Sequence, residues 1–189
     1  MDELINYLLK YGRLDQQQIA LIKSKAGLII IKKGDYFLKA GRIHNQLGFV
    51  TEGVLRVYMH DENGSDITRI FITENNFAIN ISSFNDEIPS EVGFEAISDC
   101  KILIFSKKYF TELATEIAHW NDIFLKITAA ALTTKLKISN NMLINDAKTR
   151  YLDFLKIYPG LANKIPLSAL ASYLGITQSS LSRIRKSIR

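Results

Sequence analysis

A short polar series near the C-terminal end of the chain contains the residue types that bind nucleic acid. On a helix over ITQSSLSRIRK (176–186), their spacing places them together on the outward face. The members of this series are Gln178, Ser179, Ser182, Arg183 and Lys186, with Ser180 near its edge. Base edges and phosphates in a DNA major groove accept hydrogen bonds from such amide, hydroxyl and guanidinium groups. The series therefore predicts a DNA-binding face, although a merely solvated αα-hairpin would show the same pattern.

The residues around this series have the spacing of a helix-turn-helix over 167–186. Apolar or small residues stand where two steeply crossing helices need them, at Leu170, Ala171, Leu174, Ile176, Leu181 and Ile184. Gly175 suits a turn that requires a positive φ angle. Thr177 can cap the second helix, and Pro166 can occupy the first turn of the first helix.

The charge of the chain is concentrated at the same end. From Met142 onward there are eight basic residues and two acidic ones, a net charge of +6. The whole chain carries +5, so residues 1–141 carry −1. A basic C-terminal quarter on a nearly neutral body is typical of a phosphate-binding surface, and a solvated basic tail is the alternative.

The region 27–106 changes to a strand pattern. Short runs rich in Ile, Val, Phe and Tyr are separated by Gly-, Asp- and Asn-containing turns. These runs are 28–31, 36–38, 47–51, 54–59, 67–72, 92–97 and 102–105. Strands of this length and spacing predict an antiparallel sandwich or barrel, with helices over residues 1–24 packed outside it.

A long helix is predicted over 119–141, because the segment lacks Pro and Gly and carries two adjacent apolar rows. The first row is Trp120, Phe124, Ile127, Ala131, Thr134 and Ile138, and the second is Leu125, Ala129, Leu132 and Leu136. Two rows are wider than a one-sided surface helix needs. We expect one row to pack on the sheet domain and the other on the same helix of a second subunit; a monomer that buries both rows is the alternative.

The order of sheet domain, long helix and helix-turn-helix resembles the cAMP-receptor/FNR (Crp/Fnr) family of bacterial transcription regulators. The resemblance is carried by KKGDYFLKAG (32–41), FVTEGVLRVYMHDENG (49–64), SKKYFTEL (106–113) and the segment 149–186, which is similar to short Bacteroidetes-type members. It implies an α+β fold: an N-terminal antiparallel β-roll of the cyclic-nucleotide-binding type, a long dimerisation helix, and a C-terminal helix-turn-helix. The winged hairpin that can follow this motif is expected to be missing, which would remove some phosphate contacts. We expect domains at 1–141 and 142–189.

Several roles are implied by this resemblance position by position. The DNA-binding residues are expected to be Thr177, Gln178, Ser179, Ser180, Ser182, Arg183, Arg185 and Lys186. Arg183 is the candidate for a bidentate contact to guanine, and Arg185 and Lys186 are candidates for phosphate contacts. Ser179 replaces a residue that is often acidic in the family, so the relatives' sequence preference does not carry over.

The segment that binds the ligand in cyclic-nucleotide-binding relatives departs from their pattern. Their Gly-Glu pair and arginine are replaced by Ile79-Asn80 and approximately Ser90, beside Glu91. No arginine lies between Thr73 and Lys101, and a buried phosphate without a cation is costly. We therefore expect no tight binding of cAMP or cGMP. The expected effector pocket, for another ligand or none, comprises Asn80, Ile81, Ser90, Ser139 and Asn140; the last two match base-contacting positions but could equally be solvated.

Other chemistry receives little support from the sequence. His44, His60 and His119 are far apart and are expected to be exposed, so we expect neither a metal site nor a cofactor. Cys100 is the only cysteine, which suits the cytoplasm, and Asp99 beside it should suppress its reactivity. No stretch is long and apolar enough to span a bilayer, and no membrane partner is expected.

The interpretation favoured by the sequence is a homodimeric, non-enzymatic transcription regulator on a pseudo-palindromic operator, with RNA polymerase as a partner implied only by the resemblance. Two alternatives remain at this stage. One is a small-molecule-sensing module whose C-terminal helices bind a protein, and the other is a cupin-like enzyme. The sequence does not choose the effector, the operator, or between activation and repression.

Overall fold

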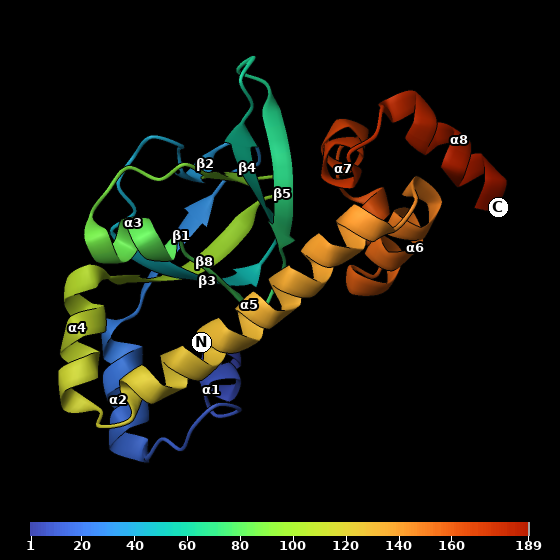
Figure 1. Ribbon diagram of the computed structural model, residues 1–189. Helices are drawn as coiled ribbons and strands as arrows, with labels where there is room; N and C mark the ends of the chain where they lie inside the picture. The colour runs from blue at the N-terminus through green and yellow to red at the C-terminus, as the bar shows by residue number, and fades with distance from the viewer. Residues whose placement is uncertain (189) are drawn as a thin grey trace.

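Two four-stranded antiparallel sheets form the centre of the molecule, as the computed structural model of residues 1–188 shows (Figure 1). The first sheet has the order β1-β8-β3-β6 and the second β2-β7-β4-β5. The strands are β1 (Gly27–Ile31), β2 (Tyr36–Leu38), β3 (Gln46–Glu52), β4 (Leu55–His60), β5 (Asp66–Ile72), β6 (Asn76–Ala78), β7 (Gly93–Ala96) and β8 (Cys100–Ser106).

The two sheets pack face to face around an apolar core that includes the fully buried residues Val50, Leu55 and Ile102. Alternation of side chains along each strand delivers these residues to the inside. The predicted antiparallel roll over 27–106 is confirmed. The short strand β6 and the helix α3 (Ile81–Asp86) that follows it were not predicted.

Helices surround the roll and extend from it. They are α1 (Asp2–Leu8), α2 (Gln16–Lys25), α4 (Lys107–Glu116), α5 (Trp120–Ile144), α6 (Ala147–Ile157), the 3-10 helix η1 (Leu161–Asn163), α7 (Leu167–Leu174) and α8 (Gln178–Ile188). The N-terminal helices, α4 and the first half of α5 cover the outer face of the first sheet, where Phe49, Phe105 and Trp120 are buried together. This covering makes the first sheet a two-sided core element.

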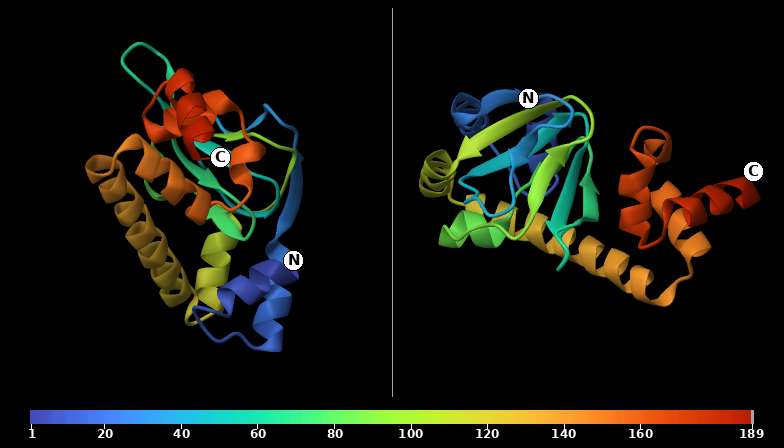
Figure 2. Two further views of the ribbon diagram at one scale, coloured as in Figure 1. Left: turned by 90° about the vertical axis from the view of Figure 1, so that its right-hand side faces the viewer. Right: turned by 90° about the horizontal axis from the view of Figure 1, so that it is seen from above.

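The long helix α5 then leaves the roll and leads to the C-terminal helices (Figure 2). Ile138 joins Tyr151, Phe154 and Leu170 in a second core. Two residues of the roll, Phe71 and Ile97, complete that core. The C-terminal helices therefore pack on the roll as well as on α5, and α8 points away from the roll in both figures.

The two apolar rows of α5 have different environments. In the first row, Trp120, Ile127 and Ile138 are buried, but Ala131 and Thr134 are exposed because the middle of α5 stands away from the roll. In the second row, Leu125, Leu132 and Leu136 are 70%, 54% and 56% exposed, and Ala129 is also exposed. The alternative in which a monomer buries both rows is therefore wrong.

The described chain gives two further findings. No strand follows α8 within residues 1–188. None of the helices in these residues is both long and apolar enough to cross a membrane. Arg189, which the charge count and the predicted domain 142–189 include, lies outside the described residues.

Candidate nucleic-acid interface

The helix-turn-helix is formed by α7 and α8, with the turn at the predicted residue. Gly175 has a φ of +64°, the left-handed conformation that a residue without Cβ adopts at low cost. Its N–H donates to the Ser172 carbonyl at 3.0 Å, and the Ile176 N–H donates to the Ala171 carbonyl at 3.0 Å. These bonds close the C-terminal end of α7 and redirect the chain into α8.

The start of α8 is capped by Thr177. The Thr177 hydroxyl oxygen accepts the Ser180 backbone N–H at 3.2 Å, as predicted for an N-cap. The same hydroxyl lies 3.0 Å from the Ser179 hydroxyl and 2.9 Å from the Ser180 hydroxyl. This cluster fixes the first turn of α8, where side chains of a recognition helix meet base edges.

The two sides of α8 differ sharply in character. Leu181 is fully buried against Leu170 and Leu174 of α7, and Ile184 is half-buried in the same core. The other side carries exposed polar residues: Thr177, Gln178, Ser179, Arg183 and Lys186, with Ser180 and Ser182 half-buried at its borders. Among residues 1–188, the structure records no hydrogen bond or ion pair from the side chains of Gln178, Arg183 or Lys186. This face can therefore donate to an external acceptor.

Arg185 differs from the expectation that it contacts phosphate. Its guanidinium donates from Nη2 to the Ala162 carbonyl at 2.7 Å and lies over the Tyr151 ring, 5.8 Å from the centroid. Its position four residues after Leu181 places it on the packed side of α8. The structure thus uses Arg185 internally.

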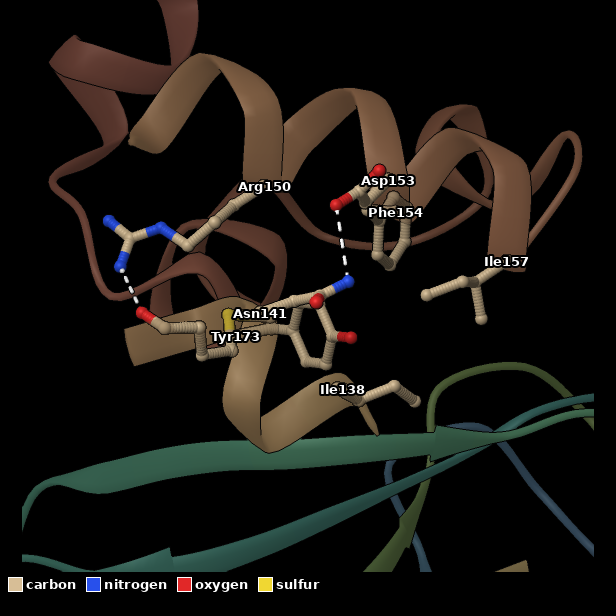
Figure 3. Close-up of a pocket in the computed structure, with 8 residues that line it drawn as sticks. Ile138, Asn141, Arg150, Asp153, Phe154, Ile157 and Tyr173 are labelled. Atoms are coloured by element: carbon tan, nitrogen blue, oxygen red, sulfur yellow. Dashed lines mark hydrogen bonds between the residues drawn. The ribbon is translucent and has the colours of Figure 1, made fainter. Parts of the chain in front are cut away.

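Arg150 is also directed into the protein, at the junction of α5, α6 and α7 (Figure 3). Its guanidinium donates to the Met142 carbonyl at 3.1 Å. In the same junction Asp153 accepts from the Asn141 and Asn145 amides at 3.4 and 3.2 Å. The two arginines on these internal contacts contribute to the net charge of the C-terminal quarter without facing outward with Arg183.

Two residues of the expected effector pocket, Asn80 and Ser90, bind each other and neighbouring polar groups. Asn80 caps α3 by accepting the Ser83 N–H at 3.0 Å, and its amide donates to the Ser90 hydroxyl at 2.8 Å. The Ser90 hydroxyl donates to the Val92 carbonyl at 2.7 Å, and Ser83 joins the His44 N–H and the Ile88 carbonyl. Ser83 and Ser90 are 1% and 2% exposed. These contacts close the connection from α3 to β7.

His44 belongs to the same cluster. The expectation that the three histidines are exposed is wrong for this residue. It is 3% exposed and lies between the rings of Phe37 and Phe94, at 5.2 and 5.5 Å. Its Nδ1 accepts the Asn80 N–H at 3.0 Å, so the neutral ring carries its proton on Nε2. Burial disfavours the charged imidazolium and lowers the pKa of His44 to about 4.

The other expected pocket residues lie apart from this cluster. Ser139 and Asn140 are exposed on α5, and Ile81 is 45% exposed on α3. One cavity, at the α5–α6–α7 junction, is lined by other residues. A second, of about 340 Å³ between the roll and η1, likewise has a different lining that includes Val54, Ile97 and Leu161. Neither of these two cavities is lined by any of the five residues.

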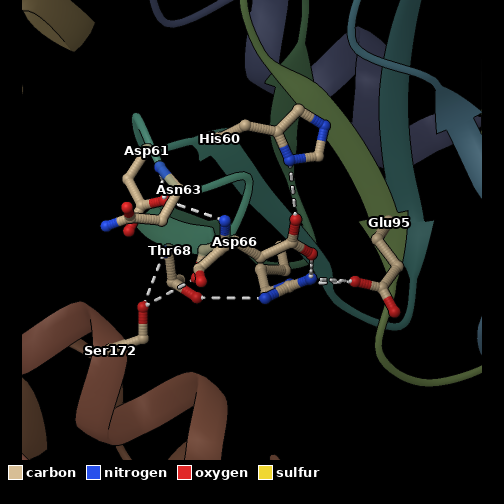
Figure 4. Close-up of polar contacts among 9 residues, drawn as sticks. His60, Asp61, Asn63, Asp66, Thr68, Glu95 and Ser172 are labelled. Carbon is tan, nitrogen blue, oxygen red and sulfur yellow. Dashed lines mark hydrogen bonds and ion pairs between the residues drawn. The ribbon is translucent and has the colours of Figure 1, made fainter.

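The helix-turn-helix also bonds directly to the roll, at edge strand β5 (Figure 4). The Thr68 N–H donates to the Ser172 hydroxyl of α7 at 2.9 Å, and that hydroxyl donates to the Asp66 carbonyl at 3.4 Å. The Asp66 carboxylate pairs with Arg56 at 2.7 Å and with His60 Nδ1 at 3.0 Å. Arg56 also pairs with Glu95, which ties β5 to the neighbouring strands β4 and β7. The orientation of α7 is thereby linked to the roll.

Cys100 is buried, as expected for a structural thiol. Burial is the main cause that raises the pKa of its thiol, and the charge of Asp99 contributes less. The sequence interpretation assigned the protection to Asp99 alone.

Comparison with known proteins assigns the fold. Residues 28–116 match the family model of the cyclic nucleotide-binding domain. The solved structure of a Crp/Fnr-family transcriptional regulator from Eubacterium rectale aligns over 96% of this chain and 87% of its own, with 19% identity and a TM-score of 0.72. The chain has the Crp/Fnr fold.

Two further solved structures of this fold are similar over most of their length. FixK2 from Bradyrhizobium japonicum covers 86% of this chain and 84% of its own, at 15% identity and a TM-score of 0.73. The c-di-GMP-responsive global regulator CLP from Xanthomonas campestris covers 92% and 91%, at 13% identity and a TM-score of 0.71. No curated protein matches the chain by sequence. The predicted fold class is thus confirmed.

Sequence reasoning missed the internal roles of His44, Ser83, Arg150 and Arg185. The spacing of Arg185 from Leu181 was a usable signal, because four residues separate them on one helix. The contacts of His44 with Asn80 and of Ser83 with the His44 N–H join segments 36 and 39 residues apart. Arg150 reaches Met142 across the turn between α5 and α6, and no local pattern records any of these three roles.

Proposed function

We propose that this Crp/Fnr-type chain is a dimeric, DNA-binding transcription regulator whose β-roll does not bind cAMP. The observation that supports it most is the exposed polar face of α8, which a helix-turn-helix with a buried apolar side holds outward. Gln178, Ser179 and Arg183 carry the groups that read base edges, and Lys186 adds a charge for phosphate. The division into domains 1–141 and 142–189 belongs to this proposal.

The dimer part of the proposal is supported by the exposed row on α5. Leu125, Ala129, Leu132, Leu136 and Leu143 follow one another at steps of four, three, four and seven, the spacing of a coiled-coil seam. Leu143 is 83% exposed, so the seam continues to the end of α5. A second copy of α5 would cover this row and present two recognition helices to DNA. Such helices suit half-sites about 34 Å apart and a pseudo-palindromic operator.

The absence of cAMP binding is supported by the network around Asn80 and Ser90. These groups already have partners inside the protein, and the segment between Thr73 and Lys101 contains no arginine to neutralise a phosphate. A cyclic nucleotide would have to break these buried hydrogen bonds without receiving a cation in exchange. Another effector, or none, is compatible with this arrangement.

Fluorescence anisotropy tests the DNA-binding function. The purified protein is titrated onto the DNA upstream of its own gene and onto scrambled DNA, over a salt series, with and without cAMP. We expect preference for the upstream DNA, log affinity that falls linearly with log salt, and no effect of cAMP. Preference that arises only with cAMP would contradict the proposal that the β-roll does not bind cAMP. Equal binding to both DNAs under every condition would favour a protein partner for the C-terminal helices.

A single charge in the seam tests the dimer. Leu132→Glu should convert the protein to a monomer in sedimentation velocity and remove tight binding to a two-half-site DNA. The fold of the monomer should be retained, because Leu132 is 54% exposed. Thr134→Glu is the matched control: Thr134 is exposed on the same helix but lies off the seam. A Leu132→Glu protein that still sediments as a dimer would contradict the seam.

A further inference from the structure

Arg185 occupies a different side of α8 from the other basic residues of this helix. Arg183 and Lys186 are exposed, whereas Arg185 is half-buried and shares its side with Leu181 and Ile184. Its guanidinium is held by two groups outside α8, the Ala162 carbonyl and the Tyr151 ring. The contact to Ala162 is 2.7 Å long, a short charge-assisted hydrogen bond.

The acceptor of this bond lies in a short helix that cannot supply its own donors. Ala162 is the middle residue of η1 (Leu161–Asn163), and the last carbonyls of a helix have no partner within it. Ala162 itself is 4% exposed, so its carbonyl needs a donor from the protein. Arg185 supplies one and connects the last turn of α8 to η1 and, through Tyr151, to α6.

We propose that Arg185 is a positioning residue that sets the angle of the recognition helix and does not contact DNA. The inference rests on the proposed function. To reach a phosphate from the packed side, Arg185 would have to release the buried Ala162 carbonyl. The chemistry also requires arginine, because a planar guanidinium can donate to a carbonyl while its face lies on an aromatic ring, and a lysine ammonium lacks this geometry. The position of Arg183 and Gln178 against base edges then depends on Arg185.

The salt dependence of DNA binding separates positioning from phosphate contact. Log affinity falls linearly with log salt, and each phosphate contact adds about 0.9 to the magnitude of that slope. Anisotropy is measured on upstream and scrambled DNA for Arg185→Met, Arg185→Lys and Lys186→Met. We expect Arg185→Met to keep the wild-type slope and to lose about ten-fold in the ratio of specific to scrambled affinity, since a misplaced helix loses base contacts. Lys186→Met should lower the magnitude of the slope by about 0.9 and reduce the affinity for both DNAs by the same factor.

Arg185→Lys keeps the positive charge and removes only the planar guanidinium. Its circular dichroism spectrum shows whether the variant is still folded. If Arg185 positions α8, the lysine variant should lose specificity as Arg185→Met does, with an unchanged far-ultraviolet circular dichroism spectrum. If Arg185 contacts a phosphate, the lysine variant should bind like the wild type and Arg185→Met should lower the slope. That second result would overturn the inference.

Hydrogen exchange distinguishes failure of this inference from failure of the proposed function. If the wild-type protein shows no preference for any DNA, this result counts against the proposed function. The effect of the Arg185–Ala162 contact on α8 can still be measured by hydrogen exchange in that case. In Arg185→Met, amides of α8 should then exchange at least about ten-fold faster, while those of the roll are unchanged. Unaltered exchange in α8 would overturn the positioning role whether or not the protein binds DNA.

Discussion

The segment from α3 to β7 and the outer face of α8 are both rich in short polar side chains, but the structure treats them in opposite ways. Asn80, Ser83 and Ser90 bind one another and the backbone inside the roll. Gln178 and Arg183 face solvent from a helix whose other side is buried. The first region stabilises the fold and the second is available to a ligand. Residue type alone therefore does not distinguish a binding surface from a structural network.

In the buried network around Asn80, Ser90 and His44, we expect the largest effect on the free energy of unfolding to come from a change of pH. In the folded protein the pKa of His44 is lowered to about 4, whereas an unfolded histidine has a pKa of about 6.5. Between these values the unfolded chain binds the additional proton, so the free energy of unfolding falls as the pH is lowered from 6.5 to 4. The loss should total about 3 kcal/mol, at about 1.4 kcal/mol per pH unit.

Urea unfolding across this pH range measures the effect. His44→Asn should lose that part of the pH dependence, and the comparison with the wild type removes the contribution of carboxylates common to both. His119→Asn, which replaces an exposed histidine, is the control and should retain the pH dependence that His44 produces. A wild-type curve identical in slope to that of His44→Asn would show that His44 is not held neutral, and the contrast between the two regions would weaken.

In the exposed region, Arg183→Ala should leave stability nearly unchanged and reduce binding to specific DNA. A bidentate arginine–guanine contact contributes about 1–3 kcal/mol of discrimination, so affinity for the upstream DNA should fall about 5- to 150-fold and affinity for scrambled DNA much less. Competition anisotropy on both DNAs measures the ratio. Arg13→Ala removes the same charge from an exposed residue between α1 and α2 and should preserve the preference. An equal loss of affinity for both DNAs would indicate that Arg183 contacts a phosphate and does not read a base.

The sequence predicts the strands, the long helix and the turn at Gly175, because periodic burial and cap residues leave local signals. The three-residue strand β6 and the six-residue helix α3 are too short for a period. Asn75 has a φ of +61° immediately before β6. The inward contacts of His44 and Arg150 depend on partners 36 and 8 residues away, so they require the folded structure. This explains why the outward face of α8 could be assigned from the sequence and the network around Asn80 and Ser90 could not.

The smallest expected effects come from a matched pair of N-cap residues, one in each region. Asn80 caps α3 and also donates to the buried Ser90, whereas Thr177 caps α8 at the surface. Loss of an N-cap costs about 1 kcal/mol, so Thr177→Ala should lower the free energy of unfolding by about that amount. Asn80→Ala also deprives the buried Ser90 hydroxyl of a donor and should cost about 2 kcal/mol.

Urea unfolding and DNA anisotropy of both variants test whether the buried network affects only stability and the start of α8 also affects DNA binding. Thr177→Ala should weaken specific binding, because the first turn of α8 loses its hydrogen-bonded cluster, and Asn80→Ala should leave DNA binding unchanged under conditions where it is folded. If Asn80→Ala instead altered DNA affinity without unfolding, the buried network would be coupled to the helix-turn-helix. The contact of Ser172 with β5 is the route along which such coupling would run, since it joins α7 to the sheet that also contains β7, the strand at which the network ends.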